Sequence, residues 1–304
     1  MAKRDFLSLL DFSLEELNAL IQRSREFRLM HERGEVYQPL IGRTGALILR
    51  LNSTRTRVAF EAGMAQLGGH IININDASSQ LARGEPIEDL ARVLSEMVDI
   101  AMVRTLEQTE IETLAQHADI PVINAMSSTL HPCQLLADIQ TFEELRGPIA
   151  GRTVAFIGDG HNMCNSYINA ARQWGFILKI AAPDGYAPKP EFLNSTNNAQ
   201  LVESAEEAVL DAELVVTDVW SSMGHEGEEQ TRRETFAPYQ VNETLLDQAP
   251  ADVLFMHCLP AHRGEEVNDT ILNDSRCVAF HEAGNRLHSQ KALMEFLLTG
   301  EFGG

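Results

Sequence analysis

The sequence is poor in positive charge. Its 304 residues include 24 Lys and Arg against 44 Asp and Glu, which gives a formal net charge of −20. A protein that binds nucleic acid needs an excess of basic side chains to neutralise phosphates. The shortage therefore argues against a nucleic-acid partner, and an anionic small molecule would have to find a local cluster of arginines.

Cysteine is scarce and long apolar runs are absent. The four cysteines, at positions 133, 164, 258 and 277, show no metal-binding spacing and are too few for a disulfide scaffold. Reduced thiols and a cytoplasmic location are the default expectation. No apolar stretch approaches the ~18 residues of a membrane span, and the segment 7–11 is too broken for a signal-peptide core. We therefore expect no membrane partner.

Apolar residues make up 44% of the chain, so it can bury substantial cores, and 304 residues are enough for two domains. Strand-like apolar runs alternate with helical periodicity along the whole length, which predicts parallel sheets covered by helices on both faces. The fold class expected is α/β, with two open, mostly parallel, doubly wound domains. Strands are predicted at 45–49, 70–74, 100–103, 121–124, 153–157, 178–182, 214–217, 253–256 and 277–280. Helices are predicted at about 14–28, 58–67, 86–98, 107–117, 132–147, 163–174, 205–212 and 287–298.

The stretch Ser53–Arg57 is central to the prediction. It follows the apolar run Gly45–Leu49, typical of a buried strand, and precedes Val58–Leu67, whose apolar spacing is helical. At such a turn, free backbone N–H groups and the positive end of the helix dipole face a ligand. Hydroxyls and two guanidinium groups at this place predict a phosphate site, although the same residues also suit a capped helix with surface arginines.

Ligands of open α/β sheets bind beyond the carboxyl ends of the strands. In the first half this rule selects basic and hydroxylic residues, and in the second half acidic, amide and thiol groups. We therefore expect an active site in the cleft between the two domains, where an anion site faces a site for an amino ligand. The selected residues are 53–57, Arg104, Thr105 and His131, then 159–162, Asp218, His257 and Cys258.

Two other kinds of site fit less well. Gly158 and Gly160 lie between a strand and a helix, as in a dinucleotide-binding turn, but Met163 takes the place of the third glycine. A metal site built on His257 and Cys258 lacks a second close set of ligands. We therefore expect neither a nicotinamide cofactor nor a metal.

Five motifs together resemble the aspartate/ornithine carbamoyltransferase family. They occur in order over nearly the whole chain, and the third and fourth are typical of its ornithine-specific members. The motifs are Ser53-Thr54-Arg55-Thr56-Arg57, His131-Pro132-Cys133-Gln134, Asp218-Val219-Trp220-Ser221-Ser222-Met223-Gly224, His257-Cys258-Leu259-Pro260 and Asn285-Arg286-Leu287-His288-Ser289-Gln290-Lys291-Ala292.

The resemblance implies a function for each matching residue. Carbamoyl phosphate would be bound by Ser53, Thr54, Arg55, Thr56, Gln80, Arg104, His131, Gln134, Cys258, Leu259 and Arg286, with Gln80 reaching into a neighbouring subunit. Ornithine would be bound by Asn162, Asp218, Ser222 and Met223. The catalytic residues would be Arg55, Arg104, His131, Asp218 and Cys258. The Leu259–Pro260 peptide is expected to be cis.

The resemblance also implies the reaction. The carbamoyl group of carbamoyl phosphate would pass to the δ-amine of L-ornithine, giving L-citrulline and phosphate for arginine biosynthesis, without a cofactor. Residues 1–148 would bind carbamoyl phosphate, residues 149–286 would bind ornithine, and helix 287–304 would pack back on the first domain. The family implies a homo-oligomer, a trimer or a multiple of trimers. The alternatives are a carbamoyltransferase that uses another amine, and a non-catalytic homologue.

The chain departs from the family pattern beside the predicted phosphate turn. Leu49-Arg50-Leu51 stands where Phe-Glu-Lys is usual, and further departures occur at Leu90, His161 and Gly284. The usual Glu is expected to pair with an arginine of the turn. Either another acid such as Glu61 takes that role, or the turn is looser and carbamoyl phosphate binds more weakly. We expect the second outcome, an active enzyme with reduced affinity for carbamoyl phosphate, and expect Arg50→Glu with Leu51→Lys to tighten binding.

Overall fold

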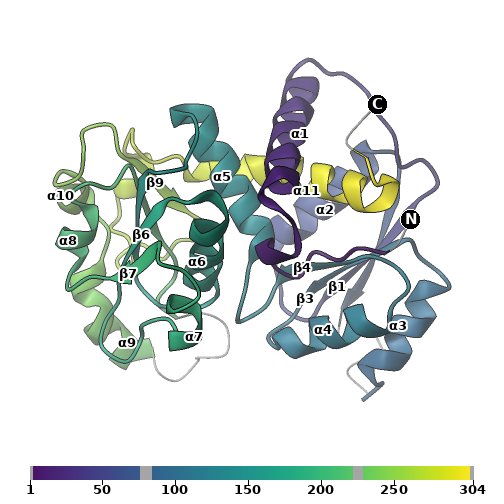
Figure 1. Cartoon of the computed structure of the whole chain (residues 1–304), viewed down its shortest axis with the longest axis horizontal. Coiled ribbons are helices and arrows are strands. Elements are labelled where there is room, and N and C mark those ends of the chain that lie inside the picture. Colours follow the sequence, from purple (N-terminus) through teal and green to yellow (C-terminus); the bar gives the residue numbers. More distant parts are fainter. Residues whose placement is uncertain (1–2, 76–83, 222–228, 302–304) are drawn as a thin grey trace. The chain divides into compact units, whose positions relative to one another are not determined.

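The computed structural model describes residues 3–75, 84–221 and 229–301 (Figure 1). The chain forms two units, each described by itself. Unit 1 comprises Met1–Gln140 and Gly284–Gly304, and unit 2 comprises Thr141–Ala283. The chain passes from one unit to the other within α5 (Pro132–Arg146) and again within α11 (Ala279–Thr299). The boundaries expected from the sequence, after residues 148 and 286, lie several residues beyond these divisions.

Unit 1 contains a parallel sheet of four strands in the order β2-β1-β3-β4. The strands are β1 (Thr44–Leu49), β2 (His70–Asn75), β3 (Ile100–Arg104) and β4 (Val122–Met126). The helices other than α5 and α11 are η1 (Leu9–Asp11), α1 (Leu14–Glu32), α2 (Thr54–Gln66), α3 (Ile87–Ser95) and α4 (Gln108–His117).

Both faces of the unit 1 sheet are covered along β1, β3 and β4, whose residues are mostly buried on both sides. Ala46 and Ile48 of β1 pack with the buried residues of α3 and α4. On the opposite face, Gly45 lies against Met64 of α2. Figure 1 shows α3 and α4 on one side of the sheet and α2 on the other. This is the double covering that the sequence pattern predicts for a parallel sheet.

Unit 2 contains a parallel sheet of five strands in the order β7-β6-β5-β8-β9. The strands are β5 (Thr153–Ile157), β6 (Ile177–Ala181), β7 (Ala199–Leu201), β8 (Leu214–Thr217) and β9 (Leu254–His257). The helices are α6 (Asn162–Trp174), α7 (Pro190–Leu193), α8 (Ala205–Val209), α9 (Glu229–Phe236), η4 (Ala237–Tyr239), α10 (Glu243–Leu246) and η5 (Ile271–Asn273). The predicted fold class, α/β with two open parallel sheets, is confirmed.

The strand order creates a switch point in each sheet. In unit 1, β1 pairs with β2 on one side and with β3 on the other. In unit 2, β5 pairs with β6 on one side and with β8 on the other. Connections leave such a point in opposite directions and open a crevice at the carboxyl ends of the strands. The segments after β1, β3, β5 and β8 are therefore the places to look for a site.

One predicted element is wrong. The apolar run 277–280 was expected to be a strand, but Cys277 makes only an isolated bridge to Phe255, and α11 already begins at Ala279. The last helix therefore starts well before the predicted residue 287. A run of four apolar residues has no periodicity that separates a strand from the buried start of a helix.

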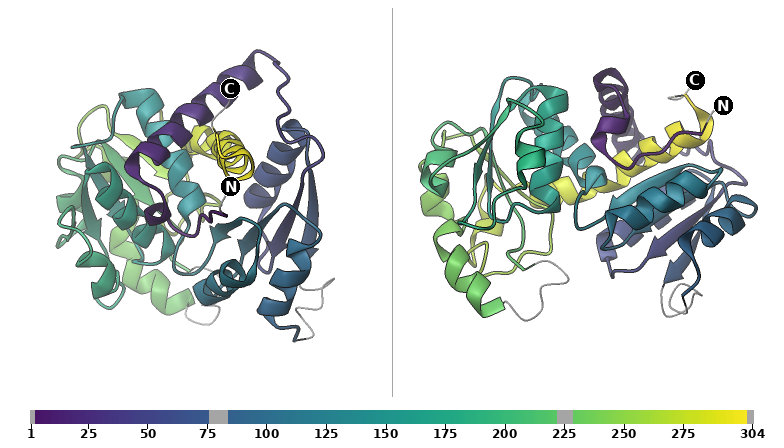
Figure 2. Two further views of the ribbon diagram at one scale, coloured as in Figure 1. Left: turned by 45° about the vertical axis from the view of Figure 1, so that its right-hand side comes forward. Right: turned by 60° about the horizontal axis from the view of Figure 1, so that its bottom comes forward.

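From Gly284 onwards the last helix packs within unit 1, beside the first one. Arg23 of α1 donates from Nε to Glu295 of α11 at 2.7 Å, and Arg28 donates to Asn285 at 2.6 Å. Figure 2 shows the C-terminal part of α11, in yellow, alongside α1.

Among the described residues, no helix has both the length and the apolar character that crossing a membrane requires.

Candidate functional site

The predicted phosphate turn is the N-terminus of α2. The helix starts at Thr54, earlier than the expected residue 58, so residues 54–57 form its first turn. Ser53 is the N-cap, and its Oγ accepts a hydrogen bond from the Thr56 N–H at 3.2 Å. A cavity of about 570 Å³ adjoins this turn and is lined by Ser53, Thr54 and Arg57 among others. The helix dipole favours an anion at this end of α2.

The two arginines of this turn have different surroundings. Arg57 is exposed, and its Nε donates to Glu61, one turn further along α2, at 2.9 Å. Arg55 is half-buried, and its positive charge helps to lower the pKa of the buried His131. Arg50 forms an ion pair with Glu110 of α4. Glu61 therefore pairs with an arginine of the turn, which is the alternative to the looser turn that the sequence led us to expect.

Three arginines of unit 1 surround His131. The imidazole is buried, with 5% of the residue exposed. Burial holds the pKa of His131 well below its usual range, and the charges of Arg286, Arg104 and Arg55 lower it further. The ring is therefore neutral near pH 7, and the cationic character of the site comes from the guanidinium groups. Arg104 Nη1 also lies 3.5 Å from Thr56 Oγ1, which connects the ends of β1 and β3.

Gln134 and Arg286 are held together by a chain of hydrogen bonds. Arg286 of α11 is 2% exposed and donates from Nη1 to Gln134 Oε1 at 2.5 Å. Gln134 in turn donates to Asp138 on the next turn of α5 at 2.8 Å. Cys133 is different, because burial raises the pKa of its thiol to about 12 and its Sγ donates to a backbone carbonyl. We assign Cys133 to the core and Gln134 to the site.

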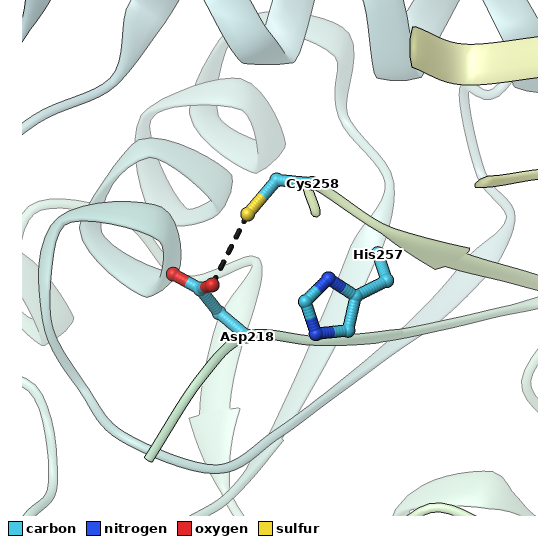
Figure 3. A group of neighbouring side chains, drawn as sticks. All are labelled: Asp218, His257 and Cys258. Carbon is cyan, nitrogen blue, oxygen red and sulfur yellow. Dashed lines mark hydrogen bonds between the residues drawn. The ribbon is translucent and has the colours of Figure 1, made fainter. Parts of the chain in front are cut away.

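In unit 2, two strand ends bring an acid and a thiol together. Asp218 follows β8 and Cys258 follows β9, and Cys258 Sγ donates to Asp218 Oδ1 at 3.1 Å (Figure 3). Burial raises the pKa of Asp218, and interactions with His257, Cys258 and the Val219 N–H partly offset that rise. The pair offers an acidic group at the edge of a sheet, as expected for binding an ammonium group.

His257 lies beside this pair, and both of its ring nitrogens are engaged. Nδ1 accepts a hydrogen bond from the Leu259 N–H at 2.8 Å, so the proton of the neutral ring is on Nε2. Nε2 lies 3.1 Å from Glu266 Oε1, and both side chains are fully buried. Asp218, His257 and Cys258 are close enough together to hold a metal ion. His257 would have to give up one of these bonds to become a ligand, so we interpret the group as a hydrogen-bonded cluster.

The β5–α6 turn carries Asn162, the first residue of α6, which is 8% exposed. His161 precedes it, and the His161 Nε2 atom lies 2.9 Å from Asp159 Oδ1. Burial lowers the pKa of His161, while the negative charge of Asp218 acts in the opposite direction. Asn162 therefore belongs to the same strand-end region of unit 2 as Asp218.

The structure thus groups most of the predicted site residues within the two units. In unit 1, the group consists of Ser53, Thr54, Arg55, Thr56, Arg104, His131, Gln134 and Arg286. In unit 2, it consists of Asn162, Asp218, Cys258 and Leu259. Gln80, Ser222 and Met223 lie outside the described residues. The predicted cis peptide between Leu259 and Pro260 is confirmed. The expected position of the site between the domains stays a prediction.

Sequence reasoning missed one acid of this region. Glu266 is fully buried and contacts His257, and its Oε1 also accepts from the His262 N–H at 2.5 Å. The sequence places it in an ordinary polar stretch after Pro260, beside the equally acidic Glu265. Nothing in the local pattern separates the buried acid from its neighbour.

Comparison with known families gives two matches that together span nearly the whole chain. The family model described as "Aspartate/ornithine carbamoyltransferase, carbamoyl-P binding domain" matches residues 4–144. The model described as "Aspartate/ornithine carbamoyltransferase, Asp/Orn binding domain" matches residues 150–297. The first covers the phosphate-type turn of unit 1, and the second covers the cluster of Asp218 and Cys258.

Individual relatives agree with these matches. The ornithine carbamoyltransferase of Psychrobacter sp. (strain PRwf-1) is 55% identical over 299 residues, which is 98% of each chain. The anabolic ornithine carbamoyltransferase of Pseudomonas aeruginosa is 54% identical over 299 residues, with the same coverage. The solved structure of ornithine carbamoyltransferase from Pyrococcus furiosus has a TM-score of 0.94 and 42% identity, and covers 99% of this chain and 98% of its own.

Proposed function

Because this chain belongs to the aspartate/ornithine carbamoyltransferase family, we propose that it transfers the carbamoyl group of carbamoyl phosphate to the δ-amine of L-ornithine. The products are L-citrulline and phosphate. The observation that carries the proposal is the basic cluster of unit 1. It combines the N-terminus of α2 with Arg55, Arg104 and Arg286 around His131 in a chain with a net charge of −20.

Carbamoyl phosphate binds through both of its ends in this proposal. The phosphate accepts hydrogen bonds from the first-turn N–H groups of α2, from the hydroxyls of Ser53 and Thr54, and from Arg55. The carbamoyl end lies near His131, Gln134 and Arg286, which the structure holds in one hydrogen-bonded or charged group. Because His131 is neutral, it acts as a hydrogen-bond donor or acceptor and adds no positive charge.

Ornithine binds through the acidic residues of unit 2. Asp218 pairs with an ammonium group, and Asn162 contributes amide contacts from the start of α6. The δ-amine resembles the side-chain amine of lysine, with a free pKa of ~10.4. It must lose its proton before it can attack, and removal from water together with the nearby arginines favours the neutral form.

The chemical step is attack of the neutral amine on the carbamoyl carbon. The C–N bond forms and the carbonyl oxygen gains negative charge. The C–O bond to phosphate then breaks, and the extra proton on the attacking nitrogen passes to the departing phosphate, which leaves as hydrogen phosphate. Thr56, Arg104 and His131 are the donors proposed for the oxyanion, because fixed donors stabilise charge that develops in the transition state. Holding two small substrates side by side supplies much of the remaining acceleration.

The test is an assay of carbamoyl transfer with three acceptors: L-ornithine, putrescine and N-acetylornithine. We expect product with L-ornithine, and expect Asp218→Asn to lose it while the fold is retained. Product with only one of the other amines would show a different carbamoyltransferase. No product with any acceptor would show a non-catalytic homologue.

Two finer statements also belong to this proposal. The relatives named anabolic support a role in arginine biosynthesis. Assembly into a trimer or a multiple of trimers, with Gln80 completing a neighbour's site, is proposed from the family resemblance. Light scattering coupled to size-exclusion chromatography tests it, and a monomer at micromolar concentration would contradict it.

A further inference from the structure

A fully buried arginine lies close to the proposed ornithine residues of unit 2. Arg232 of α9 is 2% exposed and is among the largest completely buried side chains of the described residues. Its guanidinium lies 4.7 Å from the ring centre of Tyr186 and 5.3 Å from that of Phe236. Two aromatic rings thus lie over this charge, and the ring of Trp220 stacks on one of them, that of Phe236, at 5.9 Å.

The polar contacts of Arg232 connect two segments that carry proposed ornithine residues. Its Nε donates to the backbone carbonyl of Trp220 at 2.6 Å. Its Nη2 forms an ion pair with Asp159, which is 8% exposed. Trp220 comes two residues after Asp218, and Asp159 comes three residues before Asn162. One guanidinium thus connects the segment after β8 to the turn between β5 and α6.

The β5–α6 turn has little freedom to move away from this contact. The Gly160 N–H donates to the Tyr186 carbonyl at 2.8 Å, and a Cβ at Gly160 would collide with the backbone of Pro188. The turn is therefore packed directly against the loop that supplies the ring of Tyr186. Asp159, Tyr186 and Trp220 come from three different connections of the sheet and meet at Arg232.

We propose that Arg232 and Asp159 are positioning residues for the amino-acid substrate, holding Asn162 and Asp218 at a fixed separation. The proposal rests on the proposed function. Burying a charged pair is expensive, and apolar side chains of similar volume often give equal stability. A guanidinium provides fixed directions that apolar packing lacks, because Nε of the rigid planar group donates to a carbonyl while the same group forms an ion pair with a carboxylate. The pair therefore fixes the relative positions of Asn162 and Asp218, the residues proposed to bind ornithine.

The test compares Arg232→Gln and Asp159→Asn with the wild type. Each variant should raise the KM for L-ornithine about 10- to 100-fold, the scale expected when a group is misplaced by ~1 Å. The KM for carbamoyl phosphate should change much less than the KM for L-ornithine, because most residues proposed to bind carbamoyl phosphate belong to unit 1 and only Cys258 and Leu259 belong to unit 2. Arg232→Lys keeps the charge but loses the planar guanidinium, so its KM for L-ornithine should lie between the values of the wild type and Arg232→Gln.

Arg233 provides a matched control on the same helix. Its side chain is 53% exposed and pairs with Glu265 at 2.6 Å, away from Asp159. Arg233→Gln should leave both KM values unchanged. The double variant of Arg232→Gln with Asp159→Asn should be no worse than either single variant, because the two residues act as one pair.

Several results would overturn the proposal. One is an unchanged KM for L-ornithine in soluble, folded variants, and another is an equal rise in the KM of both substrates. If Arg232→Gln fails to fold, Arg232→Lys and Asp159→Asn decide the matter alone. If the wild type forms no citrulline at all, the proposed function is wrong. If the wild type forms citrulline and the variants have the same KM for L-ornithine, only the positioning role is refuted.

Discussion

At the scale of single residues, the two arginines at the start of α2 have different predicted roles. Arg55 is half-buried and acts on His131, whereas Arg57 is exposed and paired with Glu61. We predict that Arg55→Ala lowers kcat/KM for carbamoyl phosphate by about 10²- to 10³-fold, the loss typical of a donor to developing charge. The thermal midpoint should not change, because little packing is lost. Kinetics and calorimetry on the same preparation test this.

Arg57→Ala is the matched comparison. The Arg57 guanidinium is exposed and already pairs with Glu61, and Arg55 is the arginine of this turn whose charge affects His131. This variant should therefore change kcat/KM far less than Arg55→Ala does. Equal losses in the two variants would show that both arginines contact phosphate. Normal carbamoyl phosphate affinity in Arg55→Ala would remove that residue from the site.

The departure at Arg50 leads to a second prediction at this scale. Arg50 pairs with Glu110, and Glu61 already pairs with Arg57. An acid at position 50 would face the carboxylate of Glu110, and like charges in contact repel. The double variant Arg50→Glu with Leu51→Lys should therefore leave the KM for carbamoyl phosphate unchanged or raise it. A lower KM would restore the looser-turn explanation that the sequence left open.

At the scale of elements, the start of α1 is fixed by a capping box. Ser13 Oγ accepts from the Glu16 N–H, and Glu16 accepts from the Ser13 N–H at 2.9 Å. The sequence carries the motif that defines this box, Ser-x-x-Glu before an apolar run. The structure adds a partner, since Glu16 also pairs with Arg4.

This arrangement makes the stability of α1 depend on pH. The hydrogen bond from Arg4, together with bonds from Ser13, lowers the pKa of Glu16 from 4.5 to about 2. A carboxyl group whose pKa is lower in the folded state stabilises that state above the unfolded pKa, and the stabilisation disappears as pH falls towards the folded pKa. We predict that Glu16→Gln costs about 1 kcal/mol at pH 7, a difference that shrinks as pH falls from 4.5 to 2.

Urea denaturation at a series of pH values measures this difference. Glu15→Gln is the control, because Glu15 is an exposed acid in the same first turn. A Glu16→Gln penalty that stays constant down to pH 2 would show that the charge of Glu16 does not contribute.

At the scale of the whole molecule, residues far apart in the sequence tie the first and last helices together within unit 1. Arg23 of α1 makes two hydrogen bonds to Glu295 of α11, at 2.7 and 3.0 Å, and Tyr37 donates to the same carboxylate at 2.8 Å. The side chains of Arg23 and Glu295 are 8% and 1% exposed. Removing Glu295 takes away the buried carboxylate partner of Arg23 and leaves this buried charge with the more exposed Glu26.

We therefore predict that Glu295→Gln lowers the free energy of unfolding by about 3–5 kcal/mol. Arg23 also pairs with Glu26, whose side chain is 43% exposed, so Glu26→Gln should cost less than about 1 kcal/mol. Chemical denaturation of both variants tests this. Similar small losses in both would mean that the α1–α11 contact is held by apolar packing.

The sequence by itself determined most of the helices and strands, and also those site residues that belong to short motifs. Apolar runs such as 45–49 predict strands because a parallel strand is buried on both faces, and the strand-end rule then selects Arg55, His131, Asp218 and Cys258. The prediction of a strand at 277–280 was wrong because a run of four apolar residues is too short to show a periodicity. The sequence alone was thus able to predict those helices, strands and site residues that depend on the spacing of nearby residues.

Only the tertiary structure decided which polar residues are buried and with which partners. Arg232 and Arg233 are neighbours of the same type, yet Arg232 is buried against the aromatic rings of Tyr186 and Phe236, whereas the side chain of Arg233 is 53% exposed. Glu266 and Glu265 differ in the same way. Burial and ion pairing depend on segments distant in sequence, and the partners Asp159 and Trp220 reach Arg232 only when the strands have assembled into a sheet.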